Sequence, residues 1–260
     1  MSAAVQLDGA VAELVLDGPP LNLFDSAMTG EVEAAVADIG RLVRDGSVRA
    51  VLLRAEGKVF CAGVDVHEFQ DLTPAQGSAL MSRYLTIVQQ VEALPVPTVA
   101  AVHGLCLTIW FELALGFDLL LAGDRASFGL VEAKVGLTPG GGGTQRLTAR
   151  AGAARAAEAV LTGDIYPAEV MERWGVANRV LPAAELLDAA RTLAGSLAAG
   201  PTRAAGVGKR LVQTARNHGV PAADALTPAL TGVPFGTQDL TDGIASLLRD
   251  GPGKATFTGR

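Results

Sequence analysis

The sequence predicts an α/β protein with a helical C-terminal region. Strand-like runs alternate with helical stretches as far as about residue 122, and from about Glu185 onward the pattern is mostly helical. The chain of 260 residues is 49 % hydrophobic, and no low-complexity linker interrupts it. We therefore expect one large domain with a helical appendage, divided into residues 1–195 and 196–260.

The first elements follow from their periodicity. Residues 5–16 form two alternating apolar runs around Asp8-Gly9, a pattern typical of a β-hairpin. Apolar side chains then recur at helical spacing over about residues 26–45. Residues 48–55 have the composition of a buried strand.

The same alternation continues through the middle of the chain. Residues 73–94 predict a helix, which Pro95 and Pro97 end. Three shorter elements follow, namely a strand over residues 98–102, a helix over about 109–115 and a strand over 118–122.

Composition argues against several classes of function. A net charge of −6 without a Lys/Arg cluster speaks against nucleic-acid binding. Cys61 and Cys106 lie far apart and the three histidines form no ligand set, so we expect neither a disulfide scaffold nor a metal site. Because the chain shows no signal-peptide pattern and no membrane-length apolar run, we expect a cytoplasmic protein.

Glu112 and Glu132 stand out because apolar residues surround both. Burying a carboxylate is costly unless it is paired, protonated or used in chemistry. Both residues precede a glycine loop that runs from Pro139 to Gly143. Two such acids suggest a pocket with acid–base chemistry, and the alternative is that each is a structural acid, hydrogen-bonded inside or pointing to water.

The glycine loop matches no nucleotide-binding motif. It lacks the Gly-Lys-Ser/Thr of a P-loop, and Gln145 stands where a GxGxxG motif needs its last glycine. The loop follows Pro139 and precedes a plausible helix start at Thr144, which favours a tight, defined turn. No GxSxG nucleophile motif occurs.

A series of landmarks follows in order along most of the chain. They are Leu21-Asn22, Phe60 to Asp65, His103-Gly104-Leu105, Glu112-Leu113-Ala114, Asp118, Phe128-Gly129, Glu132, Gly136, Pro139 to Leu147 and Leu161 to Asp164. Their order and spacing resemble the enoyl-CoA hydratase/isomerase family, or crotonase superfamily, over roughly residues 5–182. The resemblance implies a crotonase-like ββα spiral core with an acyl-CoA site in residues 1–195, and a helical oligomerisation region in residues 196–260.

The resemblance also implies a role for each part of the site. The backbone N–H groups of Val64 and Ile109 would form an oxyanion hole for the thioester oxygen, whose charge such donors stabilise without reorganising. Glu112 and Glu132 would add water across a 2-enoyl-CoA as an acid/base pair. Glu132 would give the proton at C2, and Glu112 would orient or activate the water.

Substrate and assembly follow from the same resemblance. The implied partner is an acyl-CoA thioester, with CoA as part of the substrate and no separate cofactor. A homotrimer or a hexamer made of two trimers is expected, in which Lys254 and Phe257 resemble the tail that closes a neighbouring subunit's CoA site. The other substrate or CoA contacts are expected at Leu23, Ala62, Val64, Asp65, Val66, Leu105, Val131, Pro139 and Gly140.

The chain departs from the family pattern just before Glu112. Thr108-Ile109-Trp110 stand where many members have three glycines, and a β-branched residue such as Ile109 resists positive φ. A helical conformation there would preserve the oxyanion donor, whereas a left-handed one would damage the hole. Trp110 would either shorten the pocket or pack into the core behind the helix.

Three functions follow from these observations. The first is hydration of a 2-enoyl-CoA, which is favoured because isomerases of the family commonly keep only the second acid. The second is isomerisation or other enolate chemistry on an acyl-CoA. The third is non-catalytic acyl-CoA binding, with the oxyanion hole blocked by Ile109 and Trp110.

Overall fold

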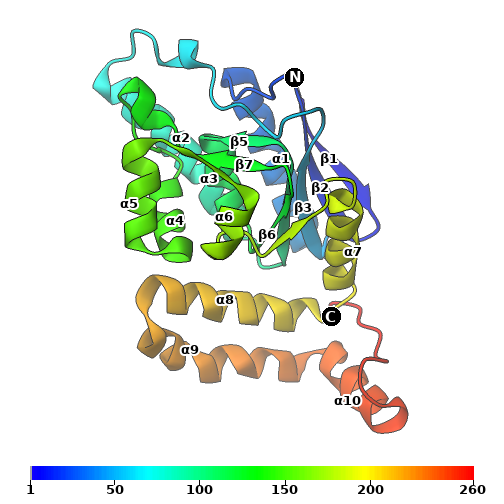
Figure 1. The fold of residues 1–260 in the computed structure, drawn as a ribbon. Helices are drawn as coiled ribbons and strands as arrows, with labels where there is room; N and C mark the ends of the chain where they lie inside the picture. The colour runs from blue at the N-terminus through cyan, green and yellow to red at the C-terminus, as the bar shows by residue number, and fades with distance from the viewer. Residues whose placement is uncertain (1) are drawn as a thin grey trace.

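The computed structural model describes residues 2–260 and contains two β-sheets flanked by helices (Figure 1). The larger sheet has six strands in the order β1-β2-β3-β4-β6-β9. Its first two strands pair antiparallel, and all further neighbours pair parallel. These strands are β1 (Ser2–Asp8), β2 (Val11–Asp17), β3 (Ala50–Ala55), β4 (Thr98–Val102), β6 (Leu119–Gly123) and β9 (Arg179–Leu181).

The predicted N-terminal elements are confirmed, with shifts at the starts of strands β1 and β3. The hairpin turns at Gly9, which takes a φ of +56° that favours glycine. The first helix, α1 (Ser26–Arg44), begins where the Asp25 carboxylate accepts the N–H of Met28 at 2.7 Å. Strand β3 starts two residues later than predicted, because the N–H of Val48 bonds to the carbonyl of Leu42 and closes the turn after α1.

The smaller sheet has three strands in the order β5-β7-β8, and it positions two segments that carry the predicted site residues. Strands β5 and β7 pair parallel, so their carboxyl ends lie at the same edge. Thr108 follows β5 and Leu130 follows β7, and this places the next segments of both strands side by side. The strands are β5 (Leu105–Leu107), β7 (Ser127–Gly129) and β8 (Ile165–Pro167).

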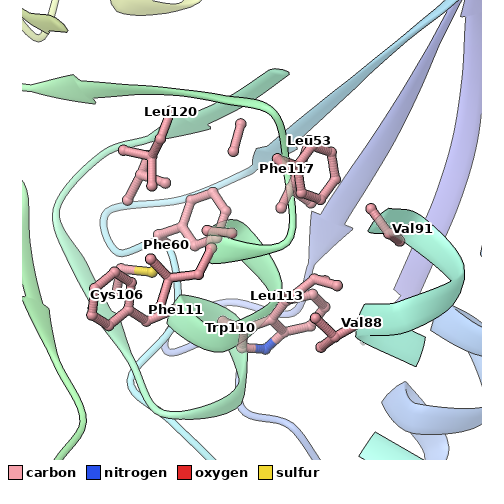
Figure 2. Close-up of a cluster of buried hydrophobic side chains, with 14 of the residues drawn as sticks. Leu53, Phe60, Val88, Val91, Cys106, Trp110, Phe111, Leu113, Phe117 and Leu120 are labelled. Atoms are coloured by element: carbon pink, nitrogen blue, oxygen red, sulfur yellow. The ribbon is translucent and has the colours of Figure 1, made fainter. Parts of the chain in front are cut away.

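A buried aromatic cluster holds the short helix α3 (Ile109–Leu115), whose bounds are those predicted. Figure 2 shows Trp110 and Phe111 among the apolar side chains of this cluster. The Trp110 ring is fully buried and meets Phe24 edge-on, with ring centroids 5.1 Å apart. Phe111 packs on Phe128 at 5.2 Å. Of the two predictions for Trp110, packing into the core is therefore the one confirmed.

The other helices of the core frame the site. Helix α2 (Pro74–Glu92) starts with a capping box between Thr73 and Gln76. Two single-turn 3₁₀ helices also belong to this part of the fold. Helix η1 (Val66–Phe69) follows an isolated bridge at Val64, and η2 (Glu132–Val135) follows strand β7. The remaining core helices are α4 (Gly143–Ala151), α5 (Ala153–Thr162) and α6 (Ala168–Arg173).

The C-terminal region is helical, as predicted. Helix α7 (Leu186–Ala198) covers one face of the large sheet, and its Leu186 and Ala190 belong to the same buried apolar cluster as Leu52 and Val99. Helices α8 and α9 run side by side beneath the core, and α10 lies beyond them (Figure 1). Their bounds are α8 (Thr202–His218), α9 (Val220–Gly232), η3 (Val233–Gly236) and α10 (Gln238–Asp250). None of the helices within residues 2–260 is long and apolar enough to cross a membrane.

Candidate active site

A cavity of about 290 Å³ lies where the segments after β5 and β7 meet, and both Glu112 and Glu132 line it. Its wall is mainly apolar. The lining residues are Ala62, Gly63, Val64, Val66, Phe69, Met81, Tyr84, Leu107, Thr108, Ile109, Glu112, Val131, Glu132, Lys134, Val135, Leu137, Thr138, Gly140 and Ile165. The two acids that the sequence singled out therefore share one apolar pocket.

Glu112 lies on α3 with only 2 % of its surface exposed. Its Oε2 accepts the backbone N–H of Gly143 at 2.6 Å. Burial raises the pKa of this carboxyl above its ordinary value. The N–H groups of the glycine loop and the positive charge of Arg146 lower the pKa and offset part of that rise. The carboxylate is thus desolvated but supplied with donors, an arrangement suited to a base.

The glycine loop packs tightly against this carboxylate. A Cβ on Gly143 would lie 2.6 Å from Cγ of Glu112, and a Cβ on Gly141 would lie 2.5 Å from Cδ1 of Ile109. Gly142 takes a φ of +89° just before α4 begins. The loop is therefore the tight, defined turn that the sequence favoured, because only glycine lets this backbone approach Glu112.

Glu132 is the first residue of η2 and differs from Glu112 in its surroundings. Its Oε2 is buried and has no hydrogen-bond partner within residues 2–260. Burial, followed by repulsion from Glu112, raises the pKa of Glu132 to about 7. A carboxyl with this pKa exchanges its proton readily near neutral pH, which suits a general acid.

The two predicted oxyanion donors flank the same cavity. Within the described residues, the backbone N–H groups of Val64 and Ile109 donate to no protein acceptor. Unpaired N–H groups beside a cavity can receive a negatively charged oxygen. Ile109 is the first residue of α3 and therefore helical, which is the conformation expected to preserve its donor.

The positive φ in this stretch falls on Thr108, one residue before Ile109. Thr108 has φ +53° and ψ −129°. For a β-branched side chain this conformation costs about 1–3 kcal/mol, the strain that clusters at functional sites. The Thr108 hydroxyl is also buried without a partner among residues 2–260, and it would lie 3.2 Å from a Cβ on Gly63.

The structure brings together part of the expected substrate and CoA contacts. Ala62, Val64, Val66, Val131 and Gly140 line the cavity. The residues outside its wall are Leu23, Asp65, Leu105 and Pro139, together with Lys254 and Phe257 in the tail. For all eleven residues, contact with CoA stays a prediction.

The C-terminal tail is fixed to its own chain. Arg49 Nη1 donates to the carbonyl of Phe257 at 3.0 Å, and the Asp239 carboxylate accepts the N–H groups of Thr258 and Gly259. The Phe257 ring lies against Gly243 of α10. Lys254 and Phe257 thus lie apart from the cavity of this chain, and their role in a neighbouring subunit's site stays a prediction.

Sequence reasoning missed several lining residues. Met81 and Tyr84 reach the cavity from α2, and Ile165 reaches it from β8. On a helix with an apolar face, such side chains look like ordinary core positions. No group of three His, Cys, Asp or Glu within residues 2–260 could hold a metal ion.

Within residues 2–260, the α/β fold places one buried and one half-buried carboxylate beside two backbone N–H groups that have no protein acceptor. Such a set of groups is suited to an acid–base enzyme that stabilises an oxyanion. The chain belongs to the enoyl-CoA hydratase/isomerase family, whose model matches residues 6–249. The resemblance stated from the sequence landmarks is thereby confirmed.

Individual relatives agree over most of their length. The chain is 34 % identical to a probable enoyl-CoA hydratase of Mycobacterium tuberculosis, covering 94 % of this chain and 93 % of the relative. It is 28 % identical to the short-chain-enoyl-CoA hydratase of Clostridium acetobutylicum, with coverage of 94 % and 93 %.

Solved structures confirm the crotonase fold. Subunit I of an enoyl-CoA hydratase from Geobacillus kaustophilus superposes with a TM-score of 0.91 at 32 % identity, covering 100 % of this chain and 99 % of that one. The enoyl-CoA hydratase of Bacillus anthracis gives a TM-score of 0.92 at 25 % identity, with both chains covered completely.

Proposed function

We propose that this protein is an enoyl-CoA hydratase, which adds water across the double bond of a 2-enoyl-CoA thioester. The observation that carries the proposal is the shared cavity of Glu112 and Glu132 beside the free N–H groups of Val64 and Ile109. Hydration needs a base for the water at C3, an acid for the proton at C2 and donors for the enolate oxygen. The cavity offers one group for each task.

The surroundings of the two acids support distinct roles. Glu112 accepts the N–H of Gly143, which fixes the carboxylate as a hydrogen-bond acceptor for a water at C3. Glu132 keeps an oxygen without a partner and a pKa of about 7, so it can deliver a proton to C2. The N–H groups of Val64 and Ile109 stabilise the enolate formed between these two steps.

The two alternatives have less support. Isomerisation within this family commonly uses only the second acid, and here both acids line the cavity. Non-catalytic binding assumed a hole blocked by Ile109 and Trp110. Ile109 is helical with a free N–H, and Trp110 packs in the core away from the cavity.

The test is the hydration of crotonyl-CoA, followed by loss of the enoyl absorbance, beside a calorimetric measurement of CoA binding. Glu132→Gln and Glu112→Gln should each lower kcat by at least about 100-fold while CoA binding persists. Turnover of a 3-enoyl-CoA to the 2-enoyl isomer without hydration would favour isomerisation. CoA binding without turnover on short and medium enoyl chains would contradict the proposed hydratase function.

We also propose that the protein assembles as a trimer or as a hexamer of two trimers. The support is the apolar surface on the C-terminal helices, where Val212, Val220, Phe235, Ile244 and Leu248 are exposed. Such a surface is typical of an interface with another chain. Light scattering on the purified protein measures the assembly, and a monomer at micromolar concentration would contradict the proposal.

A further inference from the structure

The side chain of Arg146 is hydrogen-bonded to the backbone of the glycine loop. It lies on the first turn of α4, and its Nη1 donates to the carbonyl of Gly142 at 3.2 Å. The backbone N–H of the next residue, Gly143, donates to Oε2 of Glu112. Because the Arg146 side chain is only 10 % exposed, its guanidinium acts on this turn with little screening by water.

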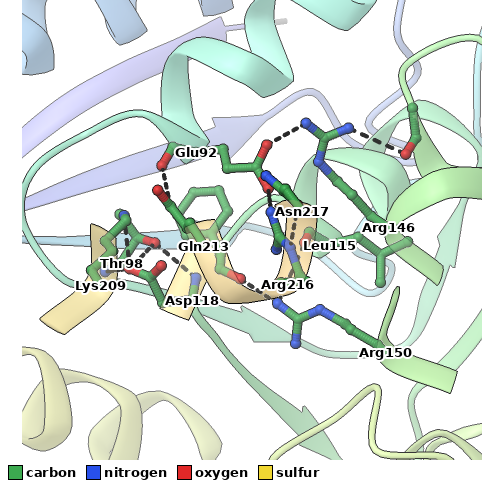
Figure 3. Close-up of polar contacts among 12 residues, drawn as sticks. Glu92, Thr98, Leu115, Asp118, Arg146, Arg150, Lys209, Gln213, Arg216 and Asn217 are labelled. Atoms are coloured by element: carbon green, nitrogen blue, oxygen red, sulfur yellow. Dashed lines mark hydrogen bonds and ion pairs between the residues drawn. The ribbon is translucent and has the colours of Figure 1, made fainter. Parts of the chain in front are cut away.

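The Glu92 carboxylate fixes Arg146 in turn. Glu92 is the last residue of α2, and its Oε2 accepts Nη2 of Arg146 at 2.5 Å. Its other oxygen, Oε1, accepts Nη2 of Arg216 on α8 at 2.5 Å. Figure 3 shows Glu92 between these two arginines. One carboxylate therefore joins the core to the C-terminal helices.

A second contact ties the same point to α8. The side-chain amide of Gln213 donates to the backbone carbonyl of Glu92 at 2.8 Å. Burial alone would raise the pKa of Glu92, but Arg146 and Arg216 outweigh it and lower that pKa. The carboxylate is thus charged at neutral pH, and both of its oxygens are engaged.

We propose that Arg146 and Glu92 are positioning residues for the acid/base pair, and that Arg216 extends this support to helix α8. The proposal rests on the hydratase function, because it assigns these residues to the orientation of Glu112. The chain of contacts runs from Arg216 through Glu92 and Arg146 to the Gly142–Gly143 turn and ends at Glu112. Placement of α8 against the core thereby contributes to the geometry of the site.

The physical reason is the cost of leaving a largely buried carboxylate with only part of its pairing. If Arg216 is removed, Glu92 loses one of two partners and the Arg146 guanidinium can follow it away from Gly142. The turn then has fewer constraints, and the Gly143 N–H meets Glu112 less often. The charged groups that face Glu112 are Glu132 and Arg146, so a displaced Arg146 would also raise the pKa of the base.

The test compares Arg216→Gln with Arg210→Gln. Arg210 lies on the same helix and makes no side-chain ion pair within residues 2–260. Its replacement therefore removes the same charge but leaves the contacts from Arg216 to Glu112 intact. In Arg216→Gln, amide hydrogen exchange across residues 140–146 should quicken. Its kcat should fall by roughly three- to tenfold with KM nearly unchanged. The limb of the pH profile that reports the base should move to higher pH, whereas Arg210→Gln should match the wild type.

Two further variants complete the design. Arg216→Lys keeps a cation near Glu92 and should recover part of the lost kcat. Glu92→Gln should reproduce the effect of Arg216→Gln on the loop. Equal exchange across residues 140–146 in Arg216→Gln and Arg210→Gln, or equal pH profiles, would overturn the proposal. Exchange needs no turnover, so absence of hydratase activity in the wild type would disprove the function separately.

Discussion

Gly143 donates its backbone N–H to Glu112 Oε2 at 2.6 Å, and Glu112 occupies the space that a side chain on Gly143 would need. The same glycine therefore both supplies a donor and makes room for the carboxylate. The tight turn that the sequence favoured is thus packed against a buried acid.

Gly143→Ala should damage the site more than the fold. Its Cβ would lie 2.6 Å from Glu112 Cγ and 2.9 Å from Oε2, so the carboxylate must move. We expect the free energy of unfolding to fall by about 1–3 kcal/mol and kcat for crotonyl-CoA to fall by about 100-fold or more. Urea unfolding and steady-state kinetics measure the two effects.

The matched control is Gly77→Ala in α2, where a Cβ meets no atom within 4 Å. This change should leave kcat unaffected and raise stability by about 0.5–1 kcal/mol, because alanine favours a helix. Activity in Gly143→Ala equal to that of this control would show that Glu112 tolerates displacement.

The protonation of Glu132 should make stability depend on pH. Its pKa is about 7 in the folded protein, against an ordinary value of 4.5. The folded state binds more protons than the unfolded state between these values, so stability falls as the pH rises from about 4.5 to about 7. The loss is about 3 kcal/mol for a shift of this size.

Glu132→Gln should remove this loss, since a neutral amide stands in for the protonated acid. The variant should be more stable than the wild type near pH 8 and equal to it near pH 4. Chemical denaturation at both pH values makes the comparison. A stability difference that is the same at both would mean that Glu132 titrates normally in the fold.

The sequence predicted the long elements and the chemically unusual residues. Helices α1 and α2 were predicted because each repeats its apolar period over 19 residues. Strands β5, β7 and β8 have three residues each, too few to show alternation, so they were not predicted. Their pairing nevertheless brings the segments before Glu112 and after Gly129 together.

The residues of the site also divide into those that the sequence predicted and those that it did not. Glu112 and Glu132 could be predicted because charge is rare in apolar segments. Met81 and Tyr84 could not, since apolar side chains on α2 look alike whether they face a cavity or the core. The Glu92–Arg146–Arg216 connection depends on how α8 docks on the core, and no local pattern specifies that docking.

Thr108→Gly should stabilise the protein. Glycine adopts the φ of +53° without the steric cost that threonine meets, and the change also removes a buried hydroxyl without a partner among residues 2–260. Against this stands the greater freedom of glycine in the unfolded chain, about 0.5–1 kcal/mol. We expect a net gain of about 1 kcal/mol in urea unfolding, and a loss of similar size would show that Thr108 is not strained.

Ile109 and Trp110 should differ in their effect on substrate choice. Ile109 lines the cavity, whereas Trp110 is fully buried against Phe24 and does not. Ile109→Ala enlarges the pocket and should raise kcat/KM for longer enoyl chains relative to crotonyl-CoA. Each methylene accommodated in an apolar pocket is worth about 1–3 kcal/mol, or about 10- to 200-fold.

Trp110→Phe is the matched control, because it alters the neighbouring residue without touching the cavity wall. It should lower the free energy of unfolding through lost packing, yet leave the ratio of kcat/KM between long and short chains unchanged. Competition between crotonyl-CoA and a longer 2-enoyl-CoA measures that ratio directly. If Trp110→Phe shifts the ratio as much as Ile109→Ala, the acyl chain reaches the core behind α3 and not only the cavity in front of it.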